Sequence, residues 1–152
     1  MLLDEEKKFA NEFVRELEDG EVLFSEGDES REMYVVKAGQ IIVTKKSKDS
    51  EVVLATLRKG DFVGDMALLE SLPRSATARA KGHAKLLALQ PGGFLLKIRR
   101  DPTFAFEMLQ KLSARLRLTN QKLLHLLDNG QVTSESVRKI VEGSEFNLVD
   151  KS

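Results

Sequence analysis

One short stretch of the sequence, "GDMALLESLPRSATA" (residues 64–78), combines a carboxylate, a guanidinium and the start of a helix. Asp65 leads into a short apolar run, and Arg74 follows nine residues later, directly after a proline. We interpret the first half as a tight turn that opens one or two helical turns. The first N–H groups of a helix lack partners within it and attract anions, and glycine lets an anion approach closely. The stretch therefore predicts an anion-binding loop.

The side chains around this turn indicate what kind of anion it would bind. Arg74 would supply a permanent, forked charge that suits the paired oxygens of a phosphate, and Ser75 and Thr77 could add hydroxyl donors. Asp65 would repel a phosphate, so it makes sense only as an acceptor for hydroxyls on the same ligand, such as those of a ribose. The plainer alternative is that Arg74 is a solvated loop residue and Asp65 only caps a helix. The joint occurrence of all these residues favours a ligand with both phosphate and sugar.

The segments before and after this stretch are short, rich in β-branched or aromatic residues, and bounded by turn residues. They recur near every ten residues, which is typical of a β-sandwich or barrel. The strands that we expect lie at 12–17, 21–25, 33–37, 40–46, 51–57, 76–80 and 84–90, the last two joined by a hairpin turn at "KGH". Roughly eight strands are enough for a jelly roll of two packed sheets. The expected fold is mainly β with flanking helices, an eight-stranded jelly roll (double-stranded β-helix) followed by a long C-terminal helix.

Helical patterns appear at both ends of the chain. Residues 1–12 have weak helical character, "GGFLLKIRR" predicts a short helix, and 103–129 runs without a breaker, with Asp101 as cap and Pro102 in the first turn. A seam with alternating spacings of three and four is formed by Leu109, Leu112, Leu116, Thr119, Leu123 and Leu126. Leu118, Leu124 and Leu127 are apolar outside it. We expect this helix to pack on the sandwich and on a second copy of the chain, the alternative being a helix that only covers its own sandwich.

Composition excludes several classes of protein. The formal net charge is zero, so the sequence shows no strong electrostatic drive towards nucleic acid or anionic lipid. Cysteine is absent, which excludes disulfides, thiolate metal sites and cysteine nucleophiles. No run approaches the roughly 20 apolar residues of a membrane span, and the N-terminus lacks a signal-peptide core. Only two histidines occur, His83 and His125, and neither has a partner at metal-ligand spacing. We expect a cytoplasmic, non-enzymatic protein without a metal, membrane or nucleic-acid partner.

Two stretches carry a resemblance to a known family. "GEVLFSEGDESREMYVVKAGQIIV" (residues 20–43) and "GDFVGDMALLESLPRSATARA" (residues 60–80), with the long helix after them, resemble the cyclic-nucleotide-binding domains of the catabolite activator protein and of protein kinase A regulatory subunits. The resemblance covers about residues 12–128. It implies the jelly-roll fold, a binding domain at 1–128 with a dimerisation and capping helix at about 102–128, and a short helical or flexible tail at 129–152. Residues 64–75 match the family's phosphate-binding cassette, and we call them the cassette.

The resemblance also implies roles for individual residues. Arg74 would pair with the cyclic phosphate, Asp65 would stand where the family's glutamate accepts from the ribose 2′-hydroxyl, and Gly64 would allow close approach. The phosphate would be lined by the backbone N–H groups of Met66, Ala67 and Ser75 and by the Ser75 hydroxyl. On the long helix, Thr119 and Asn120 match residues that face the base, in a helix that also forms the dimer interface.

Two departures from the family pattern lower the expected affinity. Aspartate replaces glutamate at 65, and valine replaces the usual aromatic residue at 63. The carboxylate is one methylene shorter, and a lost charge-assisted hydrogen bond costs about 1.5–3 kcal/mol. Ser75 is the residue that the cyclic-AMP-binding activator protein carries after its arginine, whereas threonine there favours cyclic GMP. Cyclic AMP is therefore the expected ligand, with cyclic GMP possible.

These observations support a small stand-alone regulatory protein, in which cyclic nucleotide shifts the long helix and so changes a homodimer or a downstream protein partner. The alternative is a domain that keeps the fold, has lost the ligand and serves as a dimerisation or docking module. A cupin-type enzyme would need several histidines and a carboxylate, which this chain does not offer. A transcription factor would need a DNA-reading domain after the long helix, where only about 24 residues follow.

Overall fold

A computed structural model describes residues 12–143, so the weak helix expected at 1–12 and the last part of the tail lie outside the described residues. The chain divides into two compact units between Ala105 and Phe106. This division reflects spatial compactness, whereas the binding domain expected at 1–128 is a functional unit implied by the family resemblance. That domain boundary stays a prediction. Among the described residues, no helix is both long and apolar enough to cross a membrane.

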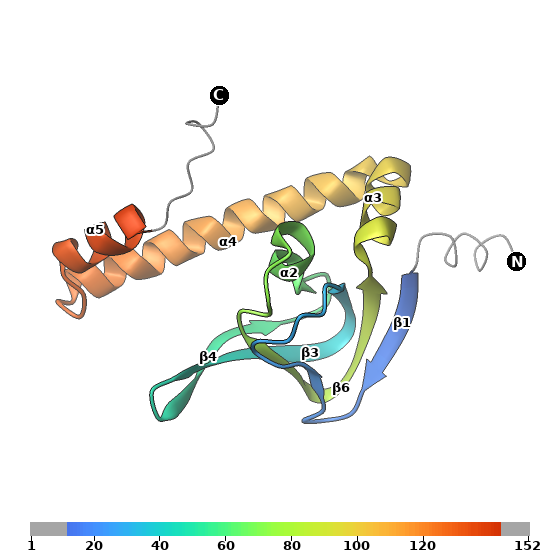
Figure 1. The fold of residues 1–152 in the computed structure, drawn as a ribbon, viewed down its shortest axis with the longest axis horizontal. Helices are drawn as coiled ribbons and strands as arrows, with labels where there is room; N and C mark the ends of the chain where they lie inside the picture. The colour runs from blue at the N-terminus through green and yellow to red at the C-terminus, as the bar shows by residue number, and fades with distance from the viewer. Residues whose placement is uncertain (1–11, 144–152) are drawn as a thin grey trace, which may run out of the picture. The chain divides into compact units, whose positions relative to one another are not determined.

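The first unit is built on one antiparallel sheet (Figure 1). Its strands are β1 (Glu12–Leu17), β2 (Val22–Phe24), β3 (Met33–Ser47), β4 (Ser50–Leu57), β5 (Phe62–Val63) and β6 (Thr77–Leu89). The main path runs β1-β6-β3-β4, while β2 pairs with β6 and β5 pairs with β3. This confirms a mainly β fold of the jelly-roll type with flanking helices.

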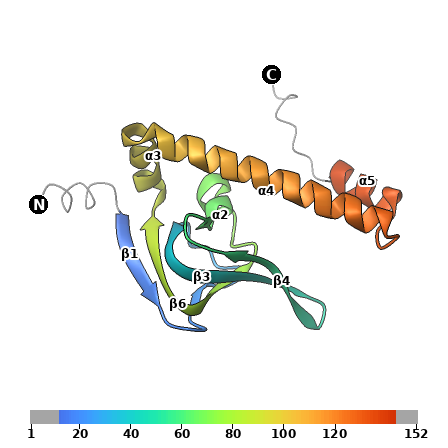
Figure 2. The same ribbon diagram turned by 180° about the vertical axis from the view of Figure 1, so that it is seen from behind.

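Two long strands replace four of the predicted short ones. β3 joins the segments expected at 33–37 and 40–46, and β6 joins those expected at 76–80 and 84–90. The hairpin expected at "KGH" was wrong, because β6 stays paired with β3 on both sides of it, with Ala38 opposite Lys85 and Gln40 opposite Lys81. The register shifts between these pairs, so the strands bend through irregularities instead of turning back (Figures 1 and 2).

The bend depends on a glycine that faces the partner strand. Gly39 has a φ of +78°, and a Cβ atom there would stand 2.2 Å from the carbonyl oxygen of His83 and 2.8 Å from the Cα of Ala84. No side chain fits in that space. Small side chains also let other elements approach β6 in the core, where Ala78, Ala80, Ala84 and Ala88 are buried alongside Leu86.

The remaining elements are helices α2 (Asp65–Glu70), α3 (Pro91–Arg100), α4 (Pro102–Asp128) and α5 (Ser134–Gly143). The predicted cap at Asp101 is confirmed, since its Oδ1 accepts from the N–H of Phe104 at 3.2 Å. At α5 the Thr133 hydroxyl accepts from the N–H of Ser136 at 3.1 Å. Within the first unit, α3 leaves the end of β6, and the Phe94 ring meets the Phe104 ring edge to face at 6.3 Å (Figure 1).

Replacing Gly39 tests the bend. Gly39→Ala should lower the free energy of unfolding by about 2 kcal/mol or more beyond Gly82→Ala, because clashes with His83 and Ala84 add to the strain of a positive φ. Gly82 has a φ of +72° but open space around it, so its substitution measures the cost of the positive φ without a steric clash. Urea unfolding followed by circular dichroism measures both variants. Equal losses would show that β3 and β6 can separate at the bend without cost.

Candidate functional site

The cassette begins with a left-handed glycine. Gly64, at φ 86° and ψ 9°, occupies the N-cap of α2, and the preceding strand β5 is held by pairing with β3. α2 ends at Ser71, also left-handed, whose N–H donates to Ala67 O at 3.1 Å. The predicted tight turn followed by one or two helical turns is therefore confirmed as local structure.

Arg74 lies buried beside this turn, with only 3% of its surface exposed. Its Nε donates to Ser30 Oγ at 3.1 Å, Nη1 to the Gly64 carbonyl at 3.2 Å and Nη2 to the Glu32 carbonyl at 2.6 Å. The Glu32 carboxylate is more distant, with Oε2 at 3.7 Å from Nη2. The alternative of a solvated loop arginine is wrong.

Gly64 is needed for a second reason besides its φ. A Cβ atom there would stand 2.6 Å from Nη1 of Arg74 and 2.8 Å from the Glu32 carbonyl oxygen. The close approach that glycine permits at this position is thus made by the chain's own guanidinium. The close approach of a ligand at Gly64, which the family resemblance implies, stays a prediction.

A second loop, between β2 and β3, closes around the arginine. The N–H of Arg74 donates to Asp28 O at 2.8 Å, its carbonyl accepts from Gly27 at 2.9 Å, and the Thr77 hydroxyl accepts from the N–H of Glu26 at 2.9 Å. Sequence analysis missed the contributions of Ser30 and Glu32 to the site. Their stretch "EGDESRE" is polar and turn-like, but only the fold shows that it meets Arg74.

Burial sets the electrostatics of Arg74. Desolvation lowers the pKa of the guanidinium; Tyr34, once ionised at high pH, and the carboxylates of Glu32 and Asp28 oppose that shift. Arginine starts so far above neutrality that it stays charged. A guanidinium carries five N–H donors, and within the described residues three of them donate to Ser30, Gly64 and Glu32. The remaining N–H donors of Arg74 and its positive charge suit an anionic ligand.

The other cassette residues lie on or next to α2. Asp65 is 5% exposed and stands in the first helical turn, where the helix dipole favours a carboxylate. It follows the N-cap rather than occupying it, so it is not the cap that the plainer alternative required. The Ser75 hydroxyl lies 3.6 Å from the sulfur of Met66, and Ala67 is buried. The structure thus gathers Gly64, Asp65, Met66, Ala67, Arg74 and Ser75 in one region.

Thr119 and Asn120 belong to the second unit. Both are exposed on α4, and the Thr119 hydroxyl donates to the carbonyl of Arg115 one turn earlier, at 2.8 Å. The structure describes each unit by itself, so a contact of these residues with a base stays a prediction.

The two histidines have other neighbours. His83 lies 3.5 Å from the Glu18 carboxylate, and His125 lies 3.0 Å from the Asn129 amide. In the part of the chain that the structure describes, no group of three or more histidine, aspartate or glutamate side chains is placed to hold a metal ion.

Comparison with known proteins finds relatives that include protein kinase regulatory subunits and a cyclic AMP receptor protein. A cAMP-dependent protein kinase regulatory subunit of Yarrowia lipolytica is 38% identical over 91 residues, which is 59% of this chain and 24% of the relative. The cyclic AMP receptor protein of Thermus thermophilus is 34% identical over 105 residues, 68% of this chain and 49% of the relative. The chain thus spans less than half the length of either relative.

Solved structures agree. The Thermus thermophilus catabolite activator protein superposes with a TM-score of 0.68 at 33% identity, covering 80% of this chain and 59% of that one. The N-terminal domain of a transcriptional regulator from Streptomyces coelicolor gives 0.57 at 32% identity, covering 79% and 86%. The family model of the cyclic nucleotide-binding domain matches residues 14–101, more than half of the chain. The site around Arg74 lies inside this match, and the chain belongs to the cyclic nucleotide-binding domain family.

Proposed function

We propose that this chain is a small, stand-alone, non-enzymatic regulator in the cytoplasm that binds a cyclic nucleotide in the cassette. The observation that carries the proposal is the buried Arg74 guanidinium, held beside Gly64 at the start of α2 with N–H donors to spare. An anion that reaches this charge recovers part of what burial costs it, and the low local dielectric strengthens the pairing.

Each cassette residue then has a task towards the ligand. Arg74 pairs with the charged oxygens of the cyclic phosphate, and the backbone N–H groups of Met66, Ala67 and Ser75 and the Ser75 hydroxyl donate to the same group. Asp65 accepts from the ribose 2′-hydroxyl. Because aspartate is one methylene shorter than glutamate, this bond is longer or bridged by water, and we expect weaker binding than in family members with glutamate.

Cyclic AMP is the nucleotide that we propose, ahead of cyclic GMP. The two relatives named above are called cAMP-dependent and cyclic AMP receptor proteins. Ser75 follows the arginine here, and threonine at that position would favour cyclic GMP. On the long helix, Thr119 and Asn120 would complete recognition of the base.

We further propose that α4 transmits binding. Its first turn belongs to the first unit, where Phe104 packs on Phe94, and the rest of the same continuous helix belongs to the second unit. Five large apolar residues of α4 are more than half exposed: Phe106, Leu109, Leu116, Leu118 and Leu124. Such an apolar surface suits a second copy of the chain or a downstream protein. Ligand and helix would be coupled to the extent that two helix positions differ in ligand affinity.

A second candidate function is a dimerisation or docking module that no longer binds nucleotide. Asp65 in place of the family's glutamate favours it, and the exposed leucines of α4 are equally consistent with it. The titration below separates the two candidates.

Wild-type protein and Arg74→Ala should differ sharply in calorimetric titration with cyclic AMP and cyclic GMP. We expect saturable binding of the wild type, tighter for cyclic AMP, and at least about a 100-fold loss in the variant, because two charge-assisted bonds disappear. Arg79→Ala is the matched control, since Arg79 pairs with Glu51 at 3.0 Å outside the cassette. No saturable heat with wild-type protein up to millimolar nucleotide would favour the docking module.

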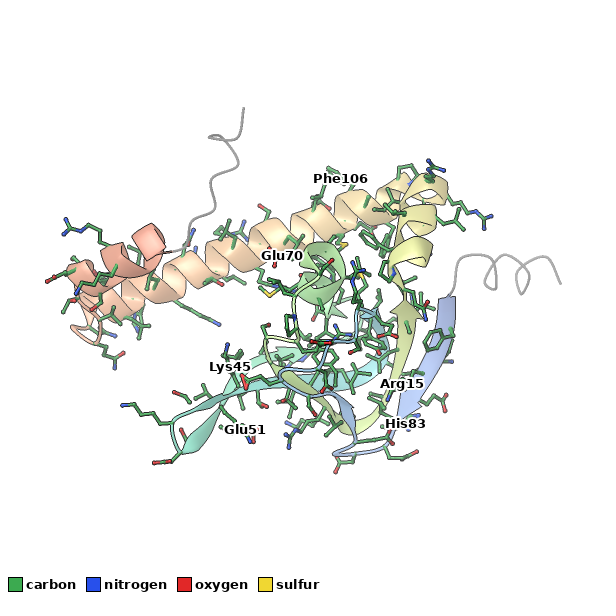
Figure 3. All side chains as sticks on the ribbon, viewed as in Figure 1. Arg15, Lys45, Glu51, Glu70, His83 and Phe106 are labelled. Carbon is green, nitrogen blue, oxygen red and sulfur yellow. The ribbon has the colours of Figure 1, made fainter. Side chains whose placement is uncertain are left out.

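Restoring the missing methylene should strengthen binding. Asp65→Glu is expected to raise the affinity for cyclic AMP by about one to two decades, because the longer carboxylate reaches the 2′-hydroxyl directly. Cyclic AMP lacking its 2′-hydroxyl provides the ligand-side control and should bind both forms alike. Glu70→Asp changes an exposed carboxylate on the same helix and should leave affinity unchanged (Figure 3). A gain that persists with the 2′-deoxy ligand would contradict the assigned role of Asp65.

A charge in the leucine seam should break the proposed homodimer. Leu116→Glu replaces a seam residue that is 63% exposed, and it should shift the chain from dimer to monomer in light scattering. Leu118→Glu makes the same change outside the seam, at a residue that is 52% exposed, and should leave the dimer intact. A wild-type monomer with and without nucleotide would refute dimerisation through α4.

A further inference from the structure

The buried guanidinium of Arg74 lies on a stack of two aromatic rings. Its Cζ atom is 4.1 Å from the centroid of the Phe24 ring. The Phe24 ring in turn stacks on Tyr34, with centroids 6.3 Å apart and an interplanar angle of 26°. Both rings are buried, with 6% and 4% of their residue surface exposed. The Arg74 guanidinium, the Phe24 ring and the Tyr34 ring therefore form one continuous stack that runs from the cassette into the core.

The far end of this stack is tied to the sheet. Arg15 Nη1 donates to the Tyr34 hydroxyl at 3.5 Å, and Arg15 lies on β1 (Figure 3). Tyr34 itself is in β3, opposite Val63, the residue directly before Gly64. Tyr34, at the far end of the stack, and the strand that leads into the cassette thus lie on two hydrogen-bonded strands, β3 and β5.

The contacts of the guanidinium divide into edge and face. Ser30, Gly64 and Glu32 accept hydrogen bonds from its edge, and Phe24 covers a face. A ring face stabilises a cation without accepting any of its N–H groups. A carboxylate at hydrogen-bond distance would instead occupy donors and neutralise the charge that an anionic ligand needs. The Glu32 carboxylate forms an ion pair with Nη2 at 3.7 Å, which is beyond hydrogen-bond distance, so it occupies none of the N–H donors.

Tyr34 keeps this platform electrically neutral. Burial raises the pKa of its phenol above the usual value near 10, so no phenolate forms at neutral pH. The stack therefore adds no negative charge that would compete with a ligand for Arg74.

We propose that Phe24, backed by Tyr34, is the positioning residue for the ligand contact of Arg74: it holds the buried cation in one plane and leaves donors free for the phosphate. This inference rests on the proposed function and adds a residue to it. With the ring gone, the guanidinium has to be ordered each time a ligand binds, and that ordering lowers affinity.

The test is Phe24→Leu, with Phe24→Tyr as the conservative variant that restores the ring. Phe24→Leu should lower the affinity for cyclic AMP about tenfold, and Phe24→Tyr should bind within about threefold of wild type. The Arg74 Hε resonance in wild-type protein should lie upfield through the ring current of Phe24, and it should move downfield in Phe24→Leu alone.

Phe94→Leu is the matched control for lost packing. Phe94 is also 6% exposed and also has one aromatic neighbour at 6.3 Å, but that neighbour is Phe104. It should lose a similar free energy of unfolding while the Arg74 resonance stays in place. Repeating Phe24→Leu in an Arg74→Lys background completes a double-mutant cycle, and its effect there should shrink to about twofold, because lysine has no planar fork to orient.

Each result decides between the possibilities. Wild-type-like affinity in Phe24→Leu, an unshifted Arg74 resonance in wild-type protein, or a full tenfold loss that persists in the Arg74→Lys background would overturn the role of Phe24 and leave the proposed function intact. Absence of cyclic-nucleotide binding by the wild type would overturn the proposed function together with this inference. If Phe24→Leu does not fold, the wild-type resonance and the Phe24→Tyr affinity still decide the question.

Discussion

The structure around the cassette depends on one constraint, which is the burial of a charged guanidinium whose ion-pair partner, the Glu32 carboxylate, lies beyond hydrogen-bond distance. Removing a charge from water is costly unless polar groups replace its hydration. Arg74 receives that replacement from two main-chain carbonyls, one hydroxyl and the face of Phe24. None of these four groups carries a full charge, so they stabilise the guanidinium without neutralising it, and the Glu32 carboxylate stays 3.7 Å away. That combination makes the site suitable for an anion.

The same constraint explains the architecture of the first unit. The carbonyl of Gly64 can reach the guanidinium only because no Cβ stands between them. The carbonyl of Glu32 is available because the loop after β2 is fastened to Arg74 through Gly27 and Asp28. Both loops are in turn anchored by β3, which pairs with β5 and β6. The cassette is therefore assembled by the sheet, and residues 64–75 would not form it alone.

Sequence reasoning predicted what depends on near neighbours. The turn and helix of the cassette, the cap at Asp101 and the long helix all follow from residues a few positions apart. It failed where the partner is distant. A glycine with positive φ fits a turn or a bend equally well, and only the pairing of β6 with β3 decides for a bend at Gly39. Ser30 and Glu32 meet Arg74 across 44 and 42 residues, a distance that local patterns do not reveal. The expected ligand roles came from a family resemblance, and the site geometry adds the protein partners of Arg74 that the resemblance did not supply.

The burial of Arg74 also affects the range and the salt dependence of its electrostatic attraction for an anion. Dissolved ions screen exposed charges beyond about 8 Å at physiological ionic strength, but they penetrate little where a side chain is 3% exposed. The molecule as a whole has no net charge with which to steer an approaching anion. The attraction between Arg74 and an anion would therefore act over a short range and depend only weakly on salt concentration. Differences in affinity would then appear mainly in the dissociation rate constant of the anion.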